Sequence, residues 1–164
     1  MKYLVLGSSG QIGYLLCDYL RKCGEEVIEY DIKRDSVGED LRKVTGVNYI
    51  YSHFFSSIIN QVDFVFFLAY DVGGSKYLEE NERTYNFINN NVLIMSNVFN
   101  WLQKLKKPFL FTSTQMSDMS HTVYGNLKLL GERYTESLGG LVVKMWNVYG
   151  IEREENKSHV ITDF

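Results

Sequence analysis

The sequence predicts an α/β fold in which a doubly wound parallel sheet is flanked by helices. Strand-like and helix-like segments alternate along the 164 residues, which is typical of a parallel sheet with helical crossovers. The strand-like residues 1–6 run directly into a glycine-rich turn that opens a helix. Residues 62–69 form the continuous apolar run VDFVFFLA, as expected for a central strand that is covered on both faces.

The turn after the first strand contains Gly7, Gly10 and Gly13. Gly7 lets the chain leave the strand with an unusual φ, and Gly10 lets bare backbone approach a pyrophosphate. Gly13 lets the helix pack closely on the strand, and the helix N-terminus then presents free N–H groups to the phosphates. The motif predicts a dinucleotide-binding turn of the Rossmann type. The alternative is a tight strand-to-helix turn without a binding role.

A helix over 14–22 leads to the second strand, 26–30, which ends at Asp31. At this spacing an acidic residue meets the ribose of adenosine. A carboxylate there accepts hydrogen bonds from both ribose hydroxyls and repels a 2′-phosphate, which favours NAD over NADP. Lys33 and Arg34 follow closely and soften this preference.

The middle of the chain predicts two helices around the central strand. The polar residues 35–38 stand where a third strand is expected, so that strand is brief or absent. Helical spacing of apolar residues predicts a helix over 49–60, and residues 70–74 form a loop after the central strand. A long helix from 82 to 105 carries apolar side chains almost all round. We therefore expect a second buried face on it, against a partner such as another subunit.

The last third predicts a strand over 109–114, a helix over 124–137 and another buried strand over 141–145. In an open α/β sheet, ligands bind beyond the carboxyl ends of the strands. Polar residues and small residues collect at those ends, namely Gly7, Asp31, Ala69, Tyr70, Ser113, Thr114 and Asn147.

Composition predicts one globular domain. Hydrophobic residues make up 45% of the chain and the net charge is −3, so nothing indicates a nucleic-acid partner. Cys17 and Cys23 lack CxxC spacing and the three histidines lack ligand spacing, so we expect neither a disulfide framework nor a metal site. No signal peptide or membrane span is evident, and we expect a cytoplasmic protein without a membrane partner.

Tyr124 and Lys128 are four residues apart, hence one turn apart on one helix face. A tyrosine has an ordinary pKa of about 10, so acid/base chemistry near neutrality requires a cation that stabilises the phenolate. Lys128 can supply that charge, and the hydroxyl of Thr114 can bind the substrate oxygen. Together they predict alcohol oxidation by hydride transfer, in which Tyr124 removes the hydroxyl proton while the hydride goes to a nicotinamide. The alternative is a packing tyrosine and a solvated lysine.

In combination, these motifs resemble the extended short-chain dehydrogenase/reductases, specifically the nucleotide-sugar epimerase and dehydratase group. The motifs are Gly7-x-x-Gly10-x-x-Gly13, Asp31, Leu68-Ala69, Thr112-Ser113-Thr114, the Tyr124/Lys128 pair and Asn147-Val148-Tyr149-Gly150. The resemblance implies that residues 1–150 form an NAD-binding domain and that 151–164 begin a truncated substrate-binding region. It also implies a homodimer through a four-helix bundle, made of the helix near Asn91 and the helix that carries Tyr124.

Matched residue by residue, the resemblance implies a cofactor site, a catalytic triad and a substrate site, and no metal. The implied cofactor residues are Gly7, Ser9, Gly10, Gln11, Ile12 and Gly13 at the pyrophosphate, Asp31 and Lys33 at the adenosine ribose, Asp40 and Leu41 at adenine, and Leu68, Ala69, Tyr70, Asn91 and Thr112 around the second ribose and nicotinamide. The implied catalytic residues are Thr114, Tyr124 and Lys128, of which the last two also contact the cofactor. The implied substrate residues are Gly73, Thr114 and Asn147.

Departures from the group narrow the reaction. Tyr124 follows Thr114 by only ten positions, so one substrate-contacting loop is trimmed. Gln115 and Met116 follow Thr114 where the 4,6-dehydratases have an acidic residue and the 3,5-epimerising enzymes have a cysteine, which argues against both reactions. Epimerisation at C4 and simple oxidation or reduction stay open, with Asp118 and His121 as candidate auxiliary acids.

The expected function is that of an NAD-dependent nucleotide-sugar epimerase or oxidoreductase, or of its cofactor-binding portion. Chains of the group continue well past the Asn147-Val148-Tyr149-Gly150 motif into a smaller, largely helical substrate domain. One alternative is a non-catalytic dinucleotide-binding or regulatory module. Another keeps the reductase chemistry with a lipid-like or aromatic carbonyl substrate. The nucleotide base, the sugar and the stereochemical outcome are left open.

Overall fold

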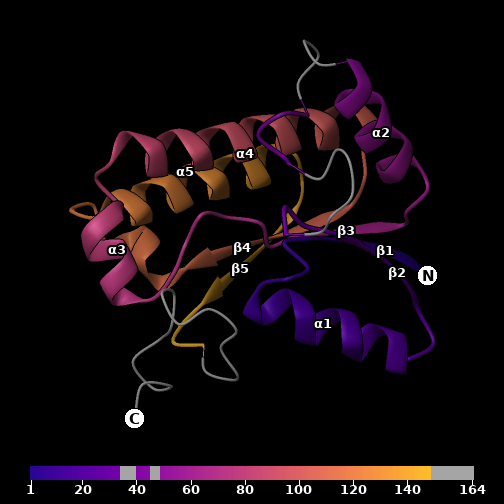
Figure 1. Ribbon diagram of the computed structural model, residues 1–164, viewed down its shortest axis with the longest axis horizontal. Coiled ribbons are helices and arrows are strands. Elements are labelled where there is room, and N and C mark those ends of the chain that lie inside the picture. The colour runs from indigo at the N-terminus through magenta and orange to yellow at the C-terminus, as the bar shows by residue number, and fades with distance from the viewer. Residues whose placement is uncertain (34–39, 45–48, 149–164) are drawn as a thin grey trace.

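The computed structural model describes residues 1–33, 40–44 and 49–148 (Figure 1). The expected start of a substrate-binding region at 151–164 lies outside these residues, as do Arg34, the polar segment 35–38, Tyr149 and Gly150. The strands are β1 (Lys2–Leu6), β2 (Glu26–Tyr30), β3 (Phe64–Phe67), β4 (Phe109–Thr114) and β5 (Leu141–Met145). The helices are α1 (Gln11–Lys22), α2 (Tyr49–Asn60), α3 (Ser75–Asn81), α4 (Tyr85–Leu105) and α5 (Val123–Ser137), with a short 3₁₀ turn, η1, at Gln115–Asp118.

The five strands are parallel and form one sheet in the order β2-β1-β3-β4-β5. Helix α1 covers one face of the sheet, whereas α2, α4 and α5 cover the other (Figure 1). The chain therefore winds in opposite directions on the two sides of β1, which confirms the predicted doubly wound sheet. In such a sheet the crevice at this reversal point is the ordinary ligand site.

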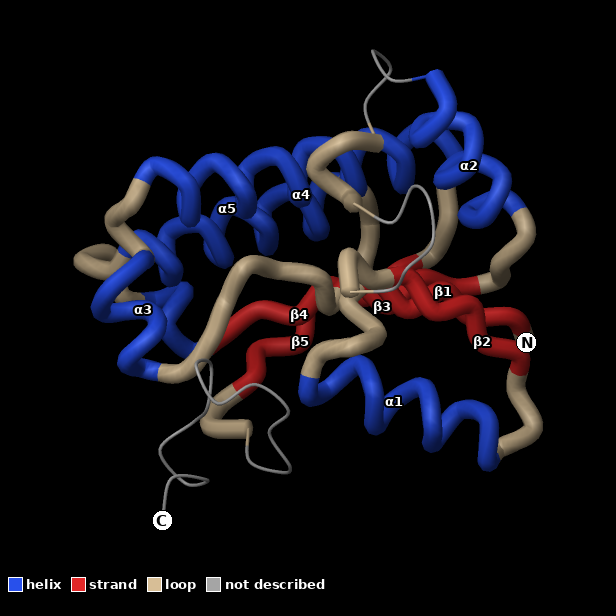
Figure 2. Tube along the Cα trace, in the orientation of Figure 1, coloured by secondary structure: helices blue, strands red, loops and turns tan. Residues whose placement is uncertain are grey.

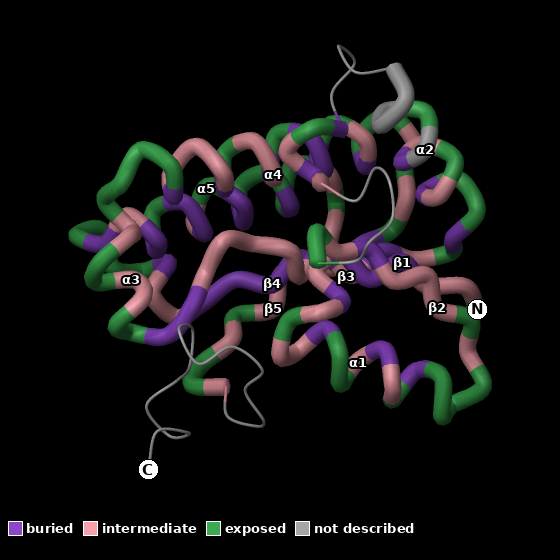
Figure 3. The backbone as a smooth tube through the Cα atoms, viewed as in Figure 1, coloured by how far each residue is buried: buried purple, intermediate pink, exposed green. Residues whose placement is uncertain are grey.

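The end of β1 is buried on both faces because its sequence is apolar without alternation, whereas in β3 the half-buried Phe64 and Phe66 alternate with the buried Val65 and Phe67. Leu4 and Leu6 of β1 are fully buried in the core under α4, and Val5 faces α1 together with Cys17. Full burial of each such side chain contributes roughly 1.5–3 kcal/mol. Figure 3 shows the buried segments gathered along the sheet and on the inner sides of the helices.

Three phenylalanines join the sheet to α4. The ring centroid of Phe99 lies 5.3 Å from that of Phe67 and 5.7 Å from that of Phe111. The centroids of Phe67 and Phe111 lie 5.3 Å apart. Aromatic pairs at such tilted geometries add about 0.5–1.5 kcal/mol each beyond the area they bury. This cluster fixes α4 over β3 and β4, directly behind the carboxyl ends of these strands.

The structure differs from the expected elements in several places, and α1, for example, begins at Gln11 rather than at 14. Residues 75–81, between the expected loop and the expected long helix, form α3. The long helix begins at Tyr85 rather than at 82, because Thr84 caps it by accepting a hydrogen bond from Phe87 N. The expected buried strand 141–145 is an edge strand among the described residues, where only β4 pairs with it, and Leu141 is 59% exposed. None of the helices within the described residues is both long and apolar enough to cross a membrane.

Candidate active site

A cavity of about 1050 Å³ lies beyond the carboxyl ends of the strands. The turn after β1, the end of β2, the loop after β3, the end of β4 and the start of α5 all contribute to its lining. Figure 2 shows the loops after β1 and β3 meeting at this end of the sheet. The volume is that of a site for a large cofactor or ligand.

The predicted site residues meet in this cavity, with one exception. Every predicted cofactor, catalytic and substrate residue except Asn91 lines it. The candidate auxiliary acids do not line it: Asp118 pairs with Lys144 at 2.9 Å, and His121 is exposed. The lining also includes Gln115 and Met116, so no acidic side chain follows Thr114 here.

The glycine turn brings bare backbone to the cavity. Gly7 has φ +87°, and a Cβ on it would lie 2.7 Å from Ala69 N. A Cβ on Gly13 would lie 2.1 Å from Gly7 O, so both positions require glycine. Gly10 caps α1 without a side-chain hydrogen bond, and Nε2 of Gln11 is buried without a partner among the described residues. Unpaired donors at a helix N-terminus fit an anionic group such as a pyrophosphate.

Asp31 is held in place at the end of β2. Its carboxylate accepts hydrogen bonds from Ser9 N at 2.9 Å and from Lys33 N at 3.0 Å. These bonds hold the carboxylate at the cavity lining, and a carboxylate has about four acceptor sites. The turn and the second strand thus bring backbone donors and a carboxylate to one end of the cavity.

Asp40 is fixed by a residue that the sequence did not single out. Arg42 donates from Nε to Oδ1 at 2.9 Å and from NH2 to Oδ2 at 3.0 Å. Burial alone would raise the pKa of Asp40, but the hydrogen bonds from Arg42 and Lys43 hold the pKa of this carboxyl below its ordinary value. Asp40 therefore stays ionised and can accept a hydrogen bond, as from an amino group of adenine.

Asn91 holds the loop after β3 rather than lining the cavity. It is fully buried, its Oδ1 accepts a hydrogen bond from Asp71 N at 2.7 Å, and its Nδ2 donates to Asp71 O and Phe87 O, each at 3.0 Å. The carboxylate of Asp71 accepts from the Tyr77 hydroxyl at 2.6 Å and from Asn90 at 3.0 Å. This network ties the loop that contains Gly73 to α3 and α4.

Thr114 ends β4, and Tyr124 and Lys128 lie in the first two turns of α5. All three side chains are buried to nine-tenths or more. Lys128 Nζ donates to Thr112 O at 2.7 Å, and it lies 3.8 Å from the ring centroid of Tyr70 and 5.9 Å from that of Tyr124. The predicted triad thus converges on one end of the cavity.

Three contacts position the N-terminus of α5. The side chain of Thr122 accepts a hydrogen bond from Gly125 N at 3.1 Å, and a Cβ on Gly125 would lie 2.1 Å from Met116 O, so η1 packs directly on the helix. Glu82 Oε2 accepts from Tyr124 N at 3.2 Å. Sequence reasoning missed Glu82, because a contact between residues 42 positions apart leaves no local pattern.

Burial dominates the electrostatics of the triad. Burial raises the pKa of Tyr124 and a hydrogen bond with Thr114 lowers it; together they bring this pKa to about 12. Burial lowers the pKa of Lys128 and the charge of Glu132 raises it; together they bring this pKa to about 7. The pKa of Tyr124 therefore lies above its ordinary value, because the desolvation of the phenol is larger than the effect of the hydrogen bond with Thr114.

Comparison with known proteins relates this geometry to one family. The model of the family described as "NAD dependent epimerase/dehydratase family" matches residues 3–164. No curated protein matches the sequence.

Within the described residues, no three His, Cys, Asp or Glu side chains gather as a metal site would require.

Several solved structures share the fold. UDP-glucose 4-epimerase from Thermotoga maritima, determined with UDP-glucose, superposes with a TM-score of 0.64 at 19% identity, over 94% of this chain and 58% of its own. UDP-glucose 4-epimerase from Bifidobacterium longum, in complex with NAD+ and UDP, gives 0.69 at 16% identity, over 88% and 52%. dTDP-4-dehydrorhamnose reductase from Bacillus anthracis, in complex with NADP, gives 0.71 at 16% identity, over 91% and 54%. The present chain therefore spans a little over half the length of these proteins.

Proposed function

The chain belongs to the NAD dependent epimerase/dehydratase family, and we propose that it is the NAD-binding portion of a nucleotide-sugar epimerase or oxidoreductase. The observation that supports this most strongly is the convergence of Thr114, Tyr124 and Lys128 on the cavity that the glycine turn and Asp31 also line. A purely structural tyrosine and lysine need not face the nucleotide turn. The convergence also favours chemistry over a regulatory module that only binds NAD.

In this proposal the turn after β1 and the N-terminus of α1 bind the pyrophosphate of NAD. Asp31 accepts hydrogen bonds from the adenosine ribose, and its negative charge disfavours a 2′-phosphate, hence NADP. Asp40 and Leu41 contact adenine, and Tyr70 and Lys128 lie toward the nicotinamide end. NAD, when bound, supplies a hydride acceptor for a carbon that bears a hydroxyl.

The chain's own part in the reaction is to hold and move a proton at the Tyr124 hydroxyl. With a pKa of about 12 the phenol is protonated at neutral pH, so it can donate a proton to a carbonyl oxygen. Removing a proton from an alcohol requires the phenolate, which the charge of Lys128 and the hydroxyl of Thr114 would stabilise. Thr114 would also bind the substrate oxygen and orient it toward Tyr124.

The absence of an acid after Thr114 supports epimerisation at C4, or simple oxidation or reduction, over dehydration. Gln115 and Met116 line the cavity there, and neither can protonate a leaving hydroxyl. The names of the solved structures support a nucleotide sugar as substrate, since they include UDP-glucose 4-epimerases and a dTDP-4-dehydrorhamnose reductase. Gly73 and Asn147 would contact the sugar nucleotide.

The test is to purify the chain, measure NAD and NADP binding by calorimetry, and then add UDP-, GDP- and dTDP-sugars while recording the absorption of reduced nicotinamide. We expect NAD to bind more tightly than NADP and one class of sugar nucleotide to produce the reduced-nicotinamide band. NAD binding without a response to any sugar would indicate a cofactor-binding module. Absence of dinucleotide binding would contradict the proposal.

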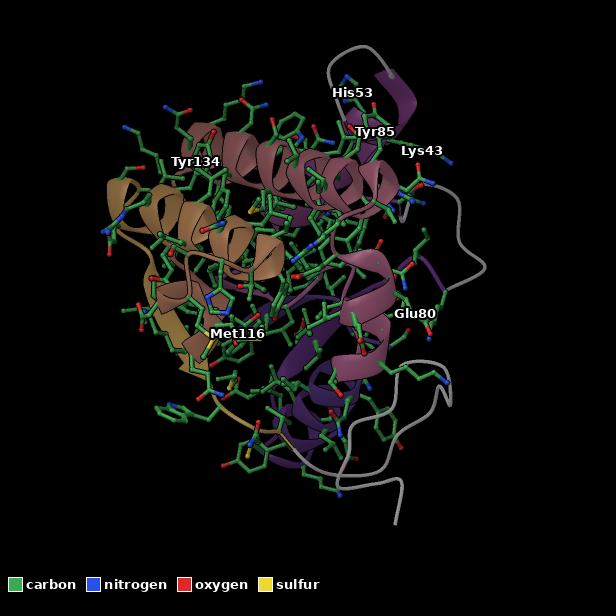
Figure 4. The ribbon with its side chains drawn as sticks, turned by 90° about the vertical axis from the view of Figure 1, so that its left-hand side faces the viewer. Lys43, His53, Glu80, Tyr85, Met116 and Tyr134 are labelled. Atoms are coloured by element: carbon green, nitrogen blue, oxygen red, sulfur yellow. The ribbon has the colours of Figure 1, made fainter. Side chains whose placement is uncertain are left out.

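Tyr124→Phe removes the proton-transferring hydroxyl and keeps the ring. We expect the rate of hydride transfer to fall by about 10²–10⁴-fold while NAD binding is kept. Tyr134→Phe on the same helix is the matched control, because its ring stacks on Phe99 at 5.1 Å, away from the cavity lining. Figure 4 shows Tyr134 near α4 on the outer side of the helical layer, whereas Met116 lies below α5. An unchanged rate in Tyr124→Phe would remove Tyr124 from the mechanism.

A further inference from the structure

Helix α5 buries a second charge beside the triad. Lys128 and Glu132 are one helical turn apart, and they are 3% and 5% exposed. Removing a charged group from water costs several kcal/mol unless it is paired. Both residues are buried, but only Lys128 lines the cavity.

Glu132 is held by two donors. The Ser113 hydroxyl donates to Oε1 at 2.5 Å, and Lys144 Nζ of β5 lies 3.5 Å from Oε2. Lys144 in turn pairs with Asp118 at 2.9 Å. The short bond to Ser113 keeps the carboxylate against β4, on the side of α5 that carries the triad.

The three last residues of β4 each contact a different residue of α5. Thr112 O accepts from Lys128, Ser113 donates to Glu132, and Thr114 is hydrogen-bonded to Tyr124. The α5 residues follow one another at intervals of four, so one face of the helix meets one strand end. Glu132 therefore belongs to the same row of contacts as the triad.

Apart from Glu132, the described groups that face Lys128 carry no negative charge. They are the Tyr124 phenol on α5, the Tyr70 phenol on the loop after β3, and the Thr112 carbonyl and Phe111 ring on β4. Burial raises the pKa of Tyr70 well above its ordinary value, so this phenol stays neutral. Among the described residues no carboxylate forms an ion pair with Lys128, and the negative charge that raises its pKa is that of Glu132, one helical turn away on the same buried face.

We propose that Glu132 is a positioning residue that keeps the buried ammonium group of Lys128 charged, and that Ser113 and Lys144 hold its carboxylate in place for this purpose. The proposal rests on the function of Lys128 proposed above. Burial has already brought the pKa of Lys128 down to about 7, so loss of the carboxylate would leave the lysine mostly neutral under ordinary conditions. A neutral lysine could not stabilise the Tyr124 phenolate.

The direct test is to follow the pKa of Lys128 by carbon NMR of its ε-methylene, assigned with Lys128→Met. In Glu132→Gln we expect the midpoint of titration to fall by about one pH unit or more, because an opposite charge is removed. Glu136→Gln is the matched control, since this exposed glutamate on the same helix pairs with Arg133 at 2.9 Å. Its Lys128 midpoint should equal that of the unmodified chain. Equal midpoints in all three proteins would overturn the proposal.

This measurement requires no substrate turnover, so it distinguishes failure of the inference from failure of the proposed function. Where turnover is measurable, the alkaline limb of the pH–rate profile should move to lower pH in Glu132→Gln, because Lys128 loses its proton earlier. A uniform loss of rate at every pH, with an unmoved limb, would show a structural role and contradict the proposal. If Glu132→Gln does not fold, Ser113→Ala is the second variant, because it keeps the carboxylate but removes the hydrogen bond that holds it. The midpoint of the Lys128 titration should again fall. An unmoved midpoint in Ser113→Ala would equally contradict the proposal.

Discussion

Two glycines of one turn require their small size for different reasons. A Cβ on Gly13 would lie 2.1 Å from Gly7 O, inside the contact between α1 and the turn, whereas one on Gly10 would lie 3.4 Å from the same atom. Gly10 has φ −71°, which any residue can adopt, and it is exposed toward the cavity. Packing within the chain thus requires glycine at position 13. At position 10 it does not, so glycine there serves the approach of a ligand.

The two alanine substitutions should separate stability from binding. We expect Gly13→Ala to lower the free energy of unfolding by about 1–3 kcal/mol, because the backbone must shift to admit the methyl group. Gly10→Ala should unfold within about 0.5 kcal/mol of the unmodified chain but bind NAD at least about tenfold more weakly, since the methyl group occupies the approach of the pyrophosphate. Urea denaturation and calorimetry measure the two effects. Tight NAD binding by a stable Gly10→Ala protein would contradict the assignment of the turn.

Lys128 should leave a signature in the pH dependence of stability. Its pKa is about 7 in the folded chain, against an ordinary value of 10.5. Between these values the unfolded chain binds more protons than the folded chain, so this group makes stability rise with pH. From pH 7 to pH 9 the rise should be about 2 kcal/mol. Above about pH 10 the raised pKa of Tyr124 acts in the opposite direction, because the unfolded chain then loses its proton first.

Lys128→Met should remove this rise, and urea denaturation at the two pH values measures it. The exposed Lys104 on α4 provides the control, since Lys104→Met should keep the slope of the unmodified chain. A slope that survives in Lys128→Met would mean that the lysine is protonated throughout this range and that its burial costs little.

At the residue scale, the predicted site residues that line the cavity include those that belong to a spacing pattern. Gly7, Gly13 and Asp31 follow from the distances between strand, turn and helix, and Tyr124 and Lys128 follow from one helical turn. Residues whose role depends on a distant partner have no such pattern: Arg42, Glu82 and Glu132 were not predicted, and Asn91 was predicted for the cofactor but holds Asp71.

At the scale of elements, the capping of α5 determines where Tyr124 lies. Thr122 accepts a hydrogen bond from Gly125 N at 3.1 Å, so the hydroxyl fixes the turn from which the tyrosine projects. Thr84 caps α4 in the same way through Phe87 N at 3.3 Å, and Thr84 itself is exposed. The chain therefore offers two equivalent caps, only one of which carries a catalytic candidate.

Thr122→Ala and Thr84→Ala should each lower the free energy of unfolding by about 1 kcal/mol, which is the usual cost of a lost cap. Only Thr122→Ala should also slow hydride transfer, because only this helix start carries Tyr124. Denaturation and single-turnover kinetics distinguish the two effects. Equal rates in the two variants would show that the cap contributes stability without positioning the tyrosine.

Most elements could be predicted because each has one dominant periodicity. The apolar run of β3 and the helical spacing of α5 are examples, and both lie within a few residues of their predicted bounds. Helix α3 could not be predicted, since its seven residues contain no buried side chain and are held through Tyr77 and Asp71 instead. The exposure of β5 could not be predicted either, because the apolar sequence of a strand does not determine how many neighbouring strands pair with it.

At the scale of the whole molecule, the outer side of the α4 and α5 layer retains apolar surface. Tyr85 and Val92 of α4 are 77% and 40% exposed, and Leu130 and Tyr134 of α5 are 44% and 43% exposed. The two helices lie side by side over the sheet (Figure 1). Apolar side chains on two adjacent helices are what a four-helix bundle between two copies would bury, which supports the homodimer proposed from the resemblance.

A charge in this surface should separate the copies. Leu130→Glu places a carboxylate on α5 where the second copy would exclude water, so we expect the dimer to dissociate at least about 100-fold more readily. Leu15→Glu is the control, because Leu15 is 51% exposed on α1, on the opposite face of the sheet. Light scattering after size exclusion, at several concentrations, gives the mass of each species. A chain that is monomeric without substitution, or a dimer that Leu130→Glu leaves intact, would show that this surface has another role.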